Sequence, residues 1–437
     1  MTNFFSILLV LNGILFIFAF TIRKPLTMTT ATAHLNSKTA ALAEPGPKQR
    51  ISSIDILRGL VMLIMAIDHC RDFFHAGHPE PTDLAITTPF LFFTRLITHF
   101  CAPTFVFLSG VSAYLAGTRR TPNQMSAFLI KRGLWLLAVE VIFITLAITL
   151  NPLYNVFVLQ VIWAIGGSMI LLGLLTWVRV PLAVIGVTGG VLVFGHNIFD
   201  VVHINAVDKS FAGQMFLTGT GFGDFQPYAH NRGFLMAYAL LPWAGVMMIG
   251  YVFGSLYAKT YDAIKRRKTL LYSGLALLVI FVILRYFNVY GDPSPWSVQK
   301  STSLSIISFL NVTKYPPSLL YLCLTLGVAL LVLASTEGIK NKFTDILVIY
   351  GNVPFFYYLC HWYLIRLTSV AVFFVQGFKT SQIVNPNLPI LFLPDNMGFN
   401  LFGVYVVWFL VITALYLPCR WYSKYKQTHA YWWLSYL

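Results

Sequence analysis

Long apolar runs, separated by short polar or basic loops, dominate the chain from Ile51 onward. A helix needs about 20 apolar residues to cross a hydrocarbon layer of about 30 Å. By that length the chain is predicted to cross a membrane ten times, at 52–70, 101–117, 133–150, 156–176, 180–196, 235–257, 270–288, 317–335, 345–375 and 399–418. Gly351 and Pro354 interrupt the long run 345–375, which indicates a broken helix whose freed backbone lines a cavity. We therefore expect an all-α, polytopic membrane protein.

A further apolar run, Phe4–Ile22, precedes these ten. Because positive charge follows this run rather than preceding it, we expect residues 1–24 to form an N-terminal transmembrane anchor and not a cleaved signal peptide. A translation start at Met28 would remove the run, and that alternative stays open. Residues 25–50 are small, polar and Pro-containing, which predicts a linker. The expected membrane domain is therefore 51–437.

The composition agrees with a membrane protein, since 57% of the 437 residues are hydrophobic and only 10% are charged. Soluble domains carry about 25% charged residues. The net charge of +15 would suggest nucleic-acid binding in a soluble protein, but most of the lysines and arginines lie in alternate loops, the pattern that fixes membrane orientation. We expect contact with membrane lipid, no nucleic-acid partner, an outside N-terminus and a cytoplasmic C-terminus. The predicted outer segments are 71–100, 196–234, 289–316 and 376–398.

The outer end of the first core span is rich in ionisable residues, in the sequence Asp68-His69-Cys-Arg71-Asp72-Phe-Phe-His75-Ala-Gly-His78. If the helix continues, Asp68, Asp72 and His75 share one face. Ionisable groups at membrane depth usually face a cavity or one another, and an imidazole beside a carboxylate is the arrangement of a general base. The candidate catalytic residues are therefore His75, His69, Asp68 and Asp72. A solvated helix end is the alternative, and because the spacing matches no zinc pattern we expect no metal.

Other polar residues in or near the expected spans are candidates for binding. Arg95 and His99 lie four residues apart on a short predicted helix, where Arg95 could pair with Asp83 or hold a substrate anion. The outer loop 196–234 could cover a site for the acceptor. The candidate substrate-binding residues are Asp83, Arg95, His99, Lys314, Asn352 and His361. Helix packing and anchoring at the membrane surface stay open as alternatives for several of them.

Five segments together resemble a known family. They are RISSIDILRGLVMLIM from Arg50, THFCAPTFVFLSG from Thr98, LPWAGVMMIGYVFG from Leu241, KYPPSLLY from Lys314 and YGNVPFFYYLCH from Tyr350. As a set, they resemble the bacterial branch of the heparan-alpha-glucosaminide N-acetyltransferase-like family. The resemblance implies a transmembrane acyltransferase fold. It also implies acetyl-CoA as a co-substrate bound from the cytoplasm, with the acetyl group delivered to an amine of a glucosamine-type sugar outside.

The same resemblance implies an active histidine in the outer loop after the DxxRG motif, which begins here at Asp55. The candidates are His75 and, less well matched, His78. Animal lysosomal members carry Asn where this chain has His69, and they have a large lumenal domain, which we do not expect in this protein. The acceptor is therefore left open, as are the acyl chain length and the choice between an acetyl-His intermediate and direct transfer.

The chemistry of acyl transfer agrees with these residue types. A sugar amine or hydroxyl needs a base, and a thioester carbonyl that develops negative charge needs donors, which Arg71 or Arg95 could supply. Candidates to bind the phosphates of CoA are Arg58, Arg119, Arg120 and Arg132. Positive-inside anchoring, or for Arg58 an ion pair with Asp55, explains them without a ligand.

We therefore predict an acetyl-CoA-dependent acyltransferase of the cell membrane, favouring a bacterial inner membrane, that acts on an extracytoplasmic glycan or amino sugar. A homodimer is compatible with the sequence but not specified by it. The alternative function is a multi-pass transporter or flippase of a sugar-like or anionic solute, without covalent chemistry. The break at Gly351–Pro354 and the buried His361 would suit that alternative equally well.

Overall fold

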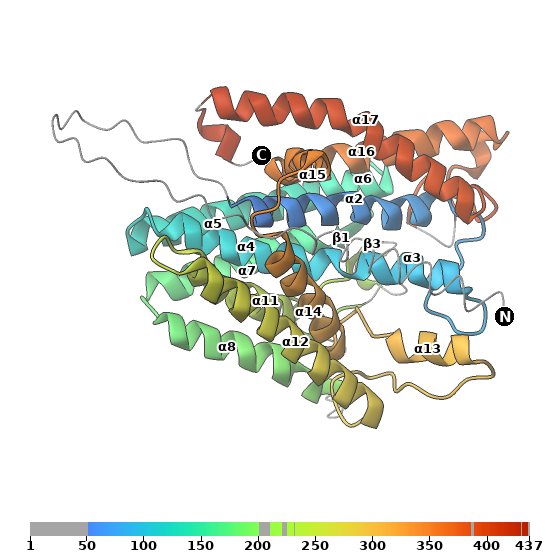
Figure 1. Cartoon of the computed structure of the whole chain (residues 1–437). Coiled ribbons are helices and arrows are strands. Elements are labelled where there is room, and N and C mark those ends of the chain that lie inside the picture. The colour runs from blue at the N-terminus through green and yellow to red at the C-terminus, as the bar shows by residue number, and fades with distance from the viewer. Residues whose placement is uncertain are drawn as a thin grey trace.

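The computed structural model describes residues 51–200, 210–220, 225–230, 232–385, 389–429 and 431–435. The predicted anchor 1–24 and linker 25–50 lie outside these residues. The described chain forms a helical bundle, with many of its helices side by side across Figure 1. Helices in this part of the chain that are long and apolar enough to cross a membrane number seven: Pro89–Gly117, Leu182–Asp200, Leu240–Tyr257, Ala263–Phe287, Leu319–Thr336, Pro354–Val375 and Leu401–Thr428. The prediction of an all-α, polytopic membrane protein is confirmed.

Each predicted core span contains a helix, and in seven of the ten spans the described helix is long and apolar enough to cross a membrane; the exceptions are 52–70, 133–150 and 156–176. The α-helices are α2 (Ser52–Phe74), α3 (Pro89–His99), α4 (Cys101–Gly117), α5 (Pro122–Val139), α6 (Thr145–Thr149), α7 (Val161–Trp177), α8 (Leu182–Gly195), α10 (Phe211–Gly213), α11 (Leu240–Phe253), α12 (Ala263–Phe287), α13 (Thr302–Leu310), α14 (Leu319–Thr336), α15 (Lys342–Asn352), α16 (Pro354–Val375) and α17 (Leu401–Thr428). A π-helical turn, η1 (Glu140–Ile144), joins α5 to α6. The predicted span 133–150 therefore begins earlier, at Pro122, and the span 399–418 continues to Thr428.

Polar side chains start many of these helices by accepting a backbone N–H of the first turn. Such caps are Thr88 before α3, Thr121 before α5, Asp262 before α12, Ser318 before α14, Asn341 before α15 and Asn400 before α17. The start of α2 differs, because its N-cap is Ile51 and no side chain caps it. The predicted pair in its first turns is present, with Arg58 Nη1 3.0 Å from Asp55 Oδ1.

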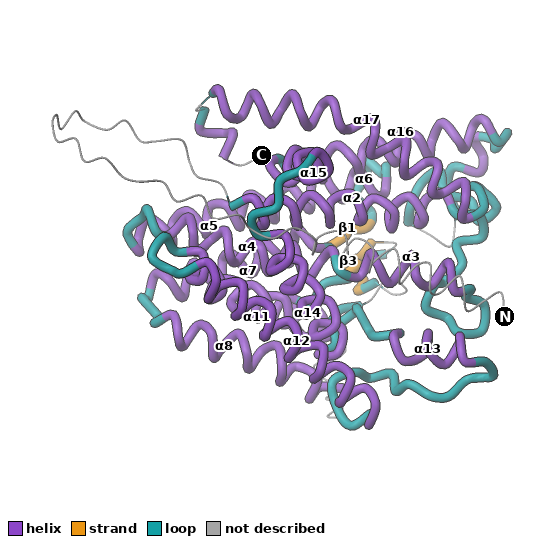
Figure 2. The backbone as a smooth tube through the Cα atoms, in the orientation of Figure 1, coloured by secondary structure: helices purple, strands orange, loops and turns teal. Residues whose placement is uncertain are grey.

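The predicted span 156–176 is wrong at its start, where four residues form strand β1 (Val156–Leu159). This strand pairs in parallel with β3 (Arg232–Met236), which pairs with β2 (Gln226–Ala229) in antiparallel fashion, giving the order β1-β3-β2. Figure 2 shows the strands in orange among the helices. A short run of β-branched and aromatic residues suits a strand as well as a helix end, and here the partner strand comes from a distant outer segment.

The predicted break in 345–375 is confirmed, and it separates two helices rather than bending one. Val353, with φ −132° and ψ 48°, lies between α15 and α16. Figure 1 shows α15 almost along its axis, whereas α2 lies across the page. Helices α2 and α15 cross at glycines. A Cβ on Gly59 of α2 would lie 1.9 Å from the Leu347 carbonyl oxygen, and a Cβ on Gly351 of α15 would lie 1.9 Å from the Asp55 carbonyl oxygen. Only α16 therefore crosses the bundle as the predicted span.

A second close helix crossing joins α4 to α11. A Cβ on Gly110 would lie 2.1 Å from the Met247 carbonyl oxygen, and one on Gly250 would lie 2.1 Å from that of Phe107. Small residues at such crossings let two backbones approach each other inside a membrane. The crossing holds α4, which directly follows α3, at a fixed distance from α11.

We expect Gly110→Val to lower thermal stability strongly, because no side chain fits at this crossing and overpacking costs about 1–3 kcal/mol or more. The measurement is thermal unfolding of the purified protein in detergent. Gly190→Val is the matched control, since a Cβ at Gly190 on α8 meets nothing within 4 Å. Equal unfolding temperatures of the two variants would contradict the close approach of α4 and α11.

The helices differ in how far the protein buries them. In the most apolar window of Pro89–Gly117, 78% of the residues are buried, against 22% for α12 and 17% for α17. Apolar helices with so little protein cover must face lipid. Helices α3 and α4 are therefore central, and polar groups on their inner faces lie inside the protein.

The four predicted outer segments meet at one end of the bundle, on the right in Figure 1. Asn311 Nδ2 donates to the Thr82 carbonyl at 2.9 Å, and the Gly77 N–H donates to the Asp395 carbonyl at 2.9 Å. His196 Nε2 lies 2.5 Å from the Pro317 carbonyl. Such contacts among distant segments agree with the predicted alternation of loops, and we call this end the outer end.

Candidate functional site

Three cations surround the carboxylate of Asp68, near the outer end of α2. Arg71 Nη2 lies 2.7 Å from Oδ1, while Arg95 Nη1 and Lys314 Nζ lie 2.5 Å and 3.9 Å from Oδ2. All four side chains are buried, and 12% or less of each is exposed. They come from α2, α3 and the segment before α14. The fold thus brings one candidate catalytic residue together with two candidate binding residues, and we name this group the Asp68 cluster.

The second carboxylate nearby lies at the edge of the cluster. Asp72 Oδ1 is 2.6 Å from Arg71 Nη2, but 46% of the Asp72 side chain is exposed. Asp68 therefore faces the interior while Asp72 faces solvent, although both lie on one helix. With three cations against these two carboxylates, the cluster keeps a net positive charge.

Two imidazoles lie beside each other next to this cluster. The ring of His69 packs on that of Trp362 with centroids 4.0 Å apart, and its centroid is 5.3 Å from that of His361. His361 is fully buried on α16, and its Nδ1 lies 2.5 Å from the Tyr358 carbonyl oxygen. Because a carbonyl only accepts, Nδ1 must carry the proton, and a neutral ring then has its lone pair on Nε2. His361 is therefore held in the tautomer that a general base needs.

Several buried polar atoms around these residues have no hydrogen-bond partner among the described residues. They are Arg71 Nη1, Arg95 Nε, His69 Nδ1, His361 Nε2 and both ring nitrogens of His99. His99 is only 2% exposed. Buried polar groups are almost always hydrogen-bonded in proteins. Their concentration around one carboxylate marks a site built for a polar ligand.

His75, the histidine favoured by sequence, lies at the edge of this region. Helix α2 ends at Phe74, so His75 is its C-cap and does not continue the face of Asp68 and Asp72. Its Nδ1 lies 3.1 Å from the Ala76 carbonyl, and its backbone bridges to Phe399. The structure thus places His75 just beyond the last turn of α2 rather than beside the Asp68 carboxylate.

His78 follows in the same outer loop, with a left-handed φ of 41°. Burial lowers the pKa of its imidazole, although the negative charges of Asp72 and Asp395 act in the opposite direction. A lowered pKa keeps His78 neutral at pH 7.

The predicted pairing of Arg95 with Asp83 is wrong. Asp83 is exposed, and its Oδ1 accepts the backbone N–H of Ala85 at 2.9 Å. Arg95 lies on the side of α3 that faces α2, so it reaches the buried Asp68 instead. The exposed carboxylate of Asp83 orders its own loop.

Arg58 and Asn352 lie near the other end of the bundle. Arg58 donates to the Gly351 carbonyl at 3.2 Å and to Ser112 Oγ at 3.0 Å, in addition to its pair with Asp55. Asn352 Nδ2 donates to Ser423 Oγ at 3.4 Å. Arg58 precedes Asp68 by ten residues on α2, so at a rise of about 1.5 Å per residue it lies about 15 Å away along the helix. Asn352 is therefore not part of the Asp68 cluster, and Arg58 holds the break between α15 and α16.

A cavity of about 460 Å³ opens at the end of the bundle opposite to the Asp68 cluster, between α4, α5, α7, α8 and α11. Arg120 and Arg179 line it, with the rings of Tyr114 and Tyr251. Arg119 and Arg132, two other candidates for CoA phosphate, are not among its lining residues. Arg179 was missed by sequence reasoning because it is a lone cation in a two-helix turn. The backbone of Arg179 is in the left-handed region, with φ 59°. This conformation could not be predicted from the sequence.

Sequence reasoning also missed the role of Arg366, whose side chain is fully buried on α16. Its guanidinium lies over the Phe73 ring at 4.4 Å and donates to Ser369 Oγ at 3.1 Å and to the Leu391 carbonyl at 2.6 Å. These contacts fasten the outer segment after α16 onto the end of α2. An arginine within an apolar span was the available signal.

The fold and the Asp68 cluster define a polytopic membrane protein with a buried polar site at its outer end. The family model described as heparan-alpha-glucosaminide N-acetyltransferase, catalytic, matches residues 50–285, more than half of the chain. The chain therefore belongs to this family, which makes it a membrane acyltransferase by class. No curated protein matches the chain. Lys314 and His361 lie beyond the matched residues, so the site is completed by the C-terminal part.

Proposed function

We propose that the protein moves an acetyl group from cytoplasmic acetyl-CoA to an amine or hydroxyl of an extracytoplasmic sugar. Family membership supports acyl transfer, and the outer position of the Asp68 cluster supports an acceptor that arrives from outside. The observation that carries the proposal is the meeting of His69 and His361, each with a partnerless nitrogen, beside a carboxylate held by three cations.

In direct transfer, an imidazole nitrogen takes the proton of the acceptor amine or hydroxyl as that group attacks the thioester carbonyl. The carbonyl oxygen gains negative charge, which Arg71 or Arg95 stabilises. The intermediate then collapses, the C–S bond breaks, and the proton passes to the CoA thiolate. His361 Nε2 is the best-oriented base, because the bond from Nδ1 to the Tyr358 carbonyl fixes its lone pair.

On the donor side, the cytoplasmic cavity offers a place for the phosphate groups of CoA. Arg120 and Arg179 supply positive charge there, and Arg120 is held by the Ala116 carbonyl at 2.7 Å and by the Phe128 ring. Guanidinium groups suit phosphate oxygens because they donate two parallel hydrogen bonds. An acetyl-CoA bound there would reach toward the outer end along α4.

We expect purified protein in lipid vesicles to transfer radiolabel from acetyl-CoA covalently to a glucosamine-type acceptor. His361→Gln, which removes the imidazole, should lower this turnover about a hundredfold or more, the usual contribution of a general base. His429→Gln, at the exposed C-cap of α17, is the matched control and should behave like wild type.

His75→Ala separates the two assignments of the base. Full activity of His361→Gln together with loss of activity in His75→Ala would show that the general base is His75, at the end of α2. Movement of sugar across the vesicle membrane without label transfer would instead support the transporter alternative.

A further inference from the structure

Lys314 is the cation of the Asp68 cluster to which the described residues offer no hydrogen bond. Its Nζ lies 3.9 Å from Asp68 Oδ2, which is an ion-pair distance but too long for a hydrogen bond. Arg71 and Arg95 contact the same carboxylate at 2.7 Å and 2.5 Å. The Lys314 ammonium also lies 5.1 Å from the centre of the Tyr315 ring, and the residue is 8% exposed. Its N–H groups are therefore available to a group that enters the site.

The charge of the cluster changes in a useful way when Lys314 gives up a proton. Three cations face two carboxylates, and a surplus charge inside a membrane protein is strongly unfavourable. The guanidinium groups of Arg71 and Arg95 keep their protons in proteins, whereas an ammonium can release one. With Lys314 as a neutral amine, two guanidinium groups match two carboxylates. Lys314 is thus the cation of the cluster that can act as an acid.

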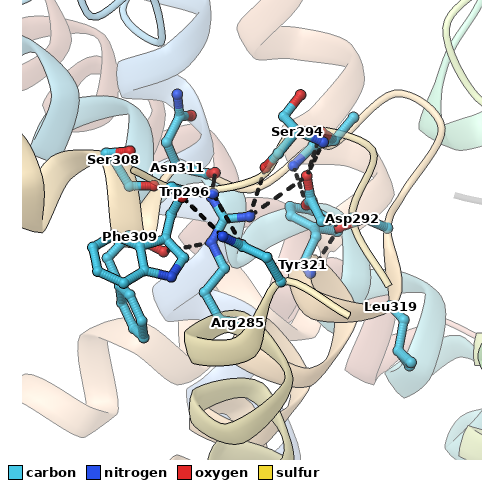
Figure 3. A network of polar contacts seen from close by, with 12 residues as sticks. Arg285, Asp292, Ser294, Trp296, Ser308, Phe309, Asn311, Leu319 and Tyr321 are labelled. Carbon is cyan, nitrogen blue, oxygen red and sulfur yellow. Dashed lines mark hydrogen bonds and ion pairs between the residues drawn. The ribbon is translucent and has the colours of Figure 1, made fainter. Parts of the chain in front are cut away.

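The position of Lys314 is set by a network that begins at a buried arginine. Arg285, at the end of α12, is only 2% exposed. It donates at 2.5–3.0 Å to four backbone carbonyls before, within and just after α13, those of Ser294, Ser308, Phe309 and Asn311. Figure 3 shows these bonds converging on one guanidinium. They fix the course of the chain between α12 and α14.

Asp292 links this arginine to the residues that flank Lys314. Its carboxylate lies 3.8 Å from Arg285 and accepts hydrogen bonds from the Thr313 N–H, the Thr313 hydroxyl and the Ser318 hydroxyl at 2.7–3.0 Å. Figure 3 shows Arg285 and Asp292 facing each other. Because Thr313 and Ser318 are both held, the backbone on either side of Lys314 is fixed, and this places the ammonium in the Asp68 cluster.

Acyl transfer needs an acid as well as a base. The base takes a proton from the acceptor, whereas the sulfur of CoA needs a proton when the C–S bond breaks. In the proposed reaction, the acceptor and the thioester approach from opposite ends of the bundle. His361 lies on α16 and Lys314 lies in the segment before α14. Two groups on different elements allow one to serve the acceptor and the other to serve the thiol.

We propose that Lys314 is a further catalytic residue of the acyl transfer, the acid that protonates the sulfur of CoA. The inference rests on the proposed function and adds a residue to it. As the C–S bond breaks, its electron pair goes to sulfur and a proton passes from Lys314 Nζ to that sulfur. The proton that His361 took from the acceptor then restores the Lys314 ammonium through the imidazole of His69, which lies next to His361. The products are the acetylated acceptor and the CoA thiol, and both residues regain their starting state.

The first test measures radiolabel transfer from acetyl-CoA to glucosamine by the full chain in lipid vesicles. Lys314→Arg keeps the positive charge and the donors but cannot release a proton. We therefore expect it to lower kcat about a hundredfold or more, with little change in the KM for acetyl-CoA or in thermal stability. Near-wild-type turnover of Lys314→Arg would overturn the proposal. Lys300→Gln is the matched control, because Lys300 is an exposed lysine of the same outer segment.

A second acetyl donor separates proton transfer from other roles of the lysine. The acetyl thioester of 4-nitrothiophenol releases a weakly basic thiolate, which leaves without a proton. Lys314→Arg and Lys314→Gln should therefore transfer acetyl from this donor at a rate close to that of the wild type, although both lose turnover with acetyl-CoA. Equal losses with the two donors would show that Lys314 shapes the site or stabilises the oxyanion, and would overturn its role as the acid.

Asp292 is a positioning residue in this scheme, because it acts through Lys314. Asp292→Asn should lower kcat in the wild-type background and have no further effect in the Lys314→Gln background, since coupled residues are not additive. Glu337→Gln is the matched control, because Glu337 pairs with Arg266 and joins the same helices, α12 and α14, at their other ends. Its effect on kcat should be equal in both backgrounds. Additive losses from Asp292→Asn and Lys314→Gln would overturn the positioning role.

The wild-type protein distinguishes this proposal from the proposed function. If the wild type transfers no label from acetyl-CoA to an amine or a hydroxyl, the proposed function fails, and the role of Lys314 as the acid fails with it. If the wild type and Lys314→Arg transfer label equally well, the proposed function stands and only the role of Lys314 is rejected.

Discussion

Asp68→Asn is expected to lower acetyl transfer by at least about a hundredfold, comparable to removal of a general base or an oxyanion donor. The substitution keeps the size of the side chain and removes the negative charge that Arg71, Arg95 and Lys314 share. Three buried cations would then repel one another. The guanidinium groups would move away from the positions that they hold around Asp68.

The measurement is radiolabel transfer by the purified variant, with thermal unfolding recorded on the same preparation. Asp345→Asn, at an exposed position in the first turn of α15, is the matched control and should keep wild-type turnover. A second variant, Asp68→Asn with Lys314→Gln, removes the surplus cation as well. It should regain part of the lost thermal stability but none of the activity. Wild-type turnover in Asp68→Asn would show that the chemistry takes place elsewhere.

Seven of the ten predicted spans contain a described helix that is long and apolar enough to cross a membrane. They were predictable because membrane thickness sets the length of an apolar helix. What failed were local choices that depend on a distant partner. Residues 156–159 form a strand because β3 lies beside them, and α15 leaves the path of α16 because Gly59 and Gly351 let it cross α2. Hydropathy records how apolar a segment is, not which backbone it meets.

The candidate site was predictable as a region but not as a set of contacts. The density of acids and imidazoles after Ile67 identifies the outer end of α2, since such groups are rare at membrane depth. Which cation meets Asp68 depends on packing: Arg95 turns toward it from α3, and Lys314 arrives from a segment ordered by Arg285. His75 was favoured by the family resemblance and by its position along a helix that in fact ends at Phe74.

Asp292→Ala is expected to destabilise the protein by about 3–5 kcal/mol, the usual result of removing one partner of a buried ion pair. Its side chain is 1% exposed and faces Arg285. Without it, Arg285 loses the one acid it contacts among the described residues, and the hydrogen bonds that Thr313 and Ser318 donate to Asp292 are lost. Thermal unfolding in detergent measures the loss. Asp83→Ala, at an exposed outer loop, should change stability by no more than about 0.5 kcal/mol.

The double variant Asp292→Ala with Arg285→Met makes this prediction sharper. If a simple ion pair held the segment, removal of both charges would restore most of the stability. Here it should not, because Arg285 also satisfies four buried carbonyls, and each of these would be left without a donor. The double variant is therefore expected to be no more stable than Asp292→Ala. Recovery of stability in the double variant would show that the carbonyl contacts contribute little.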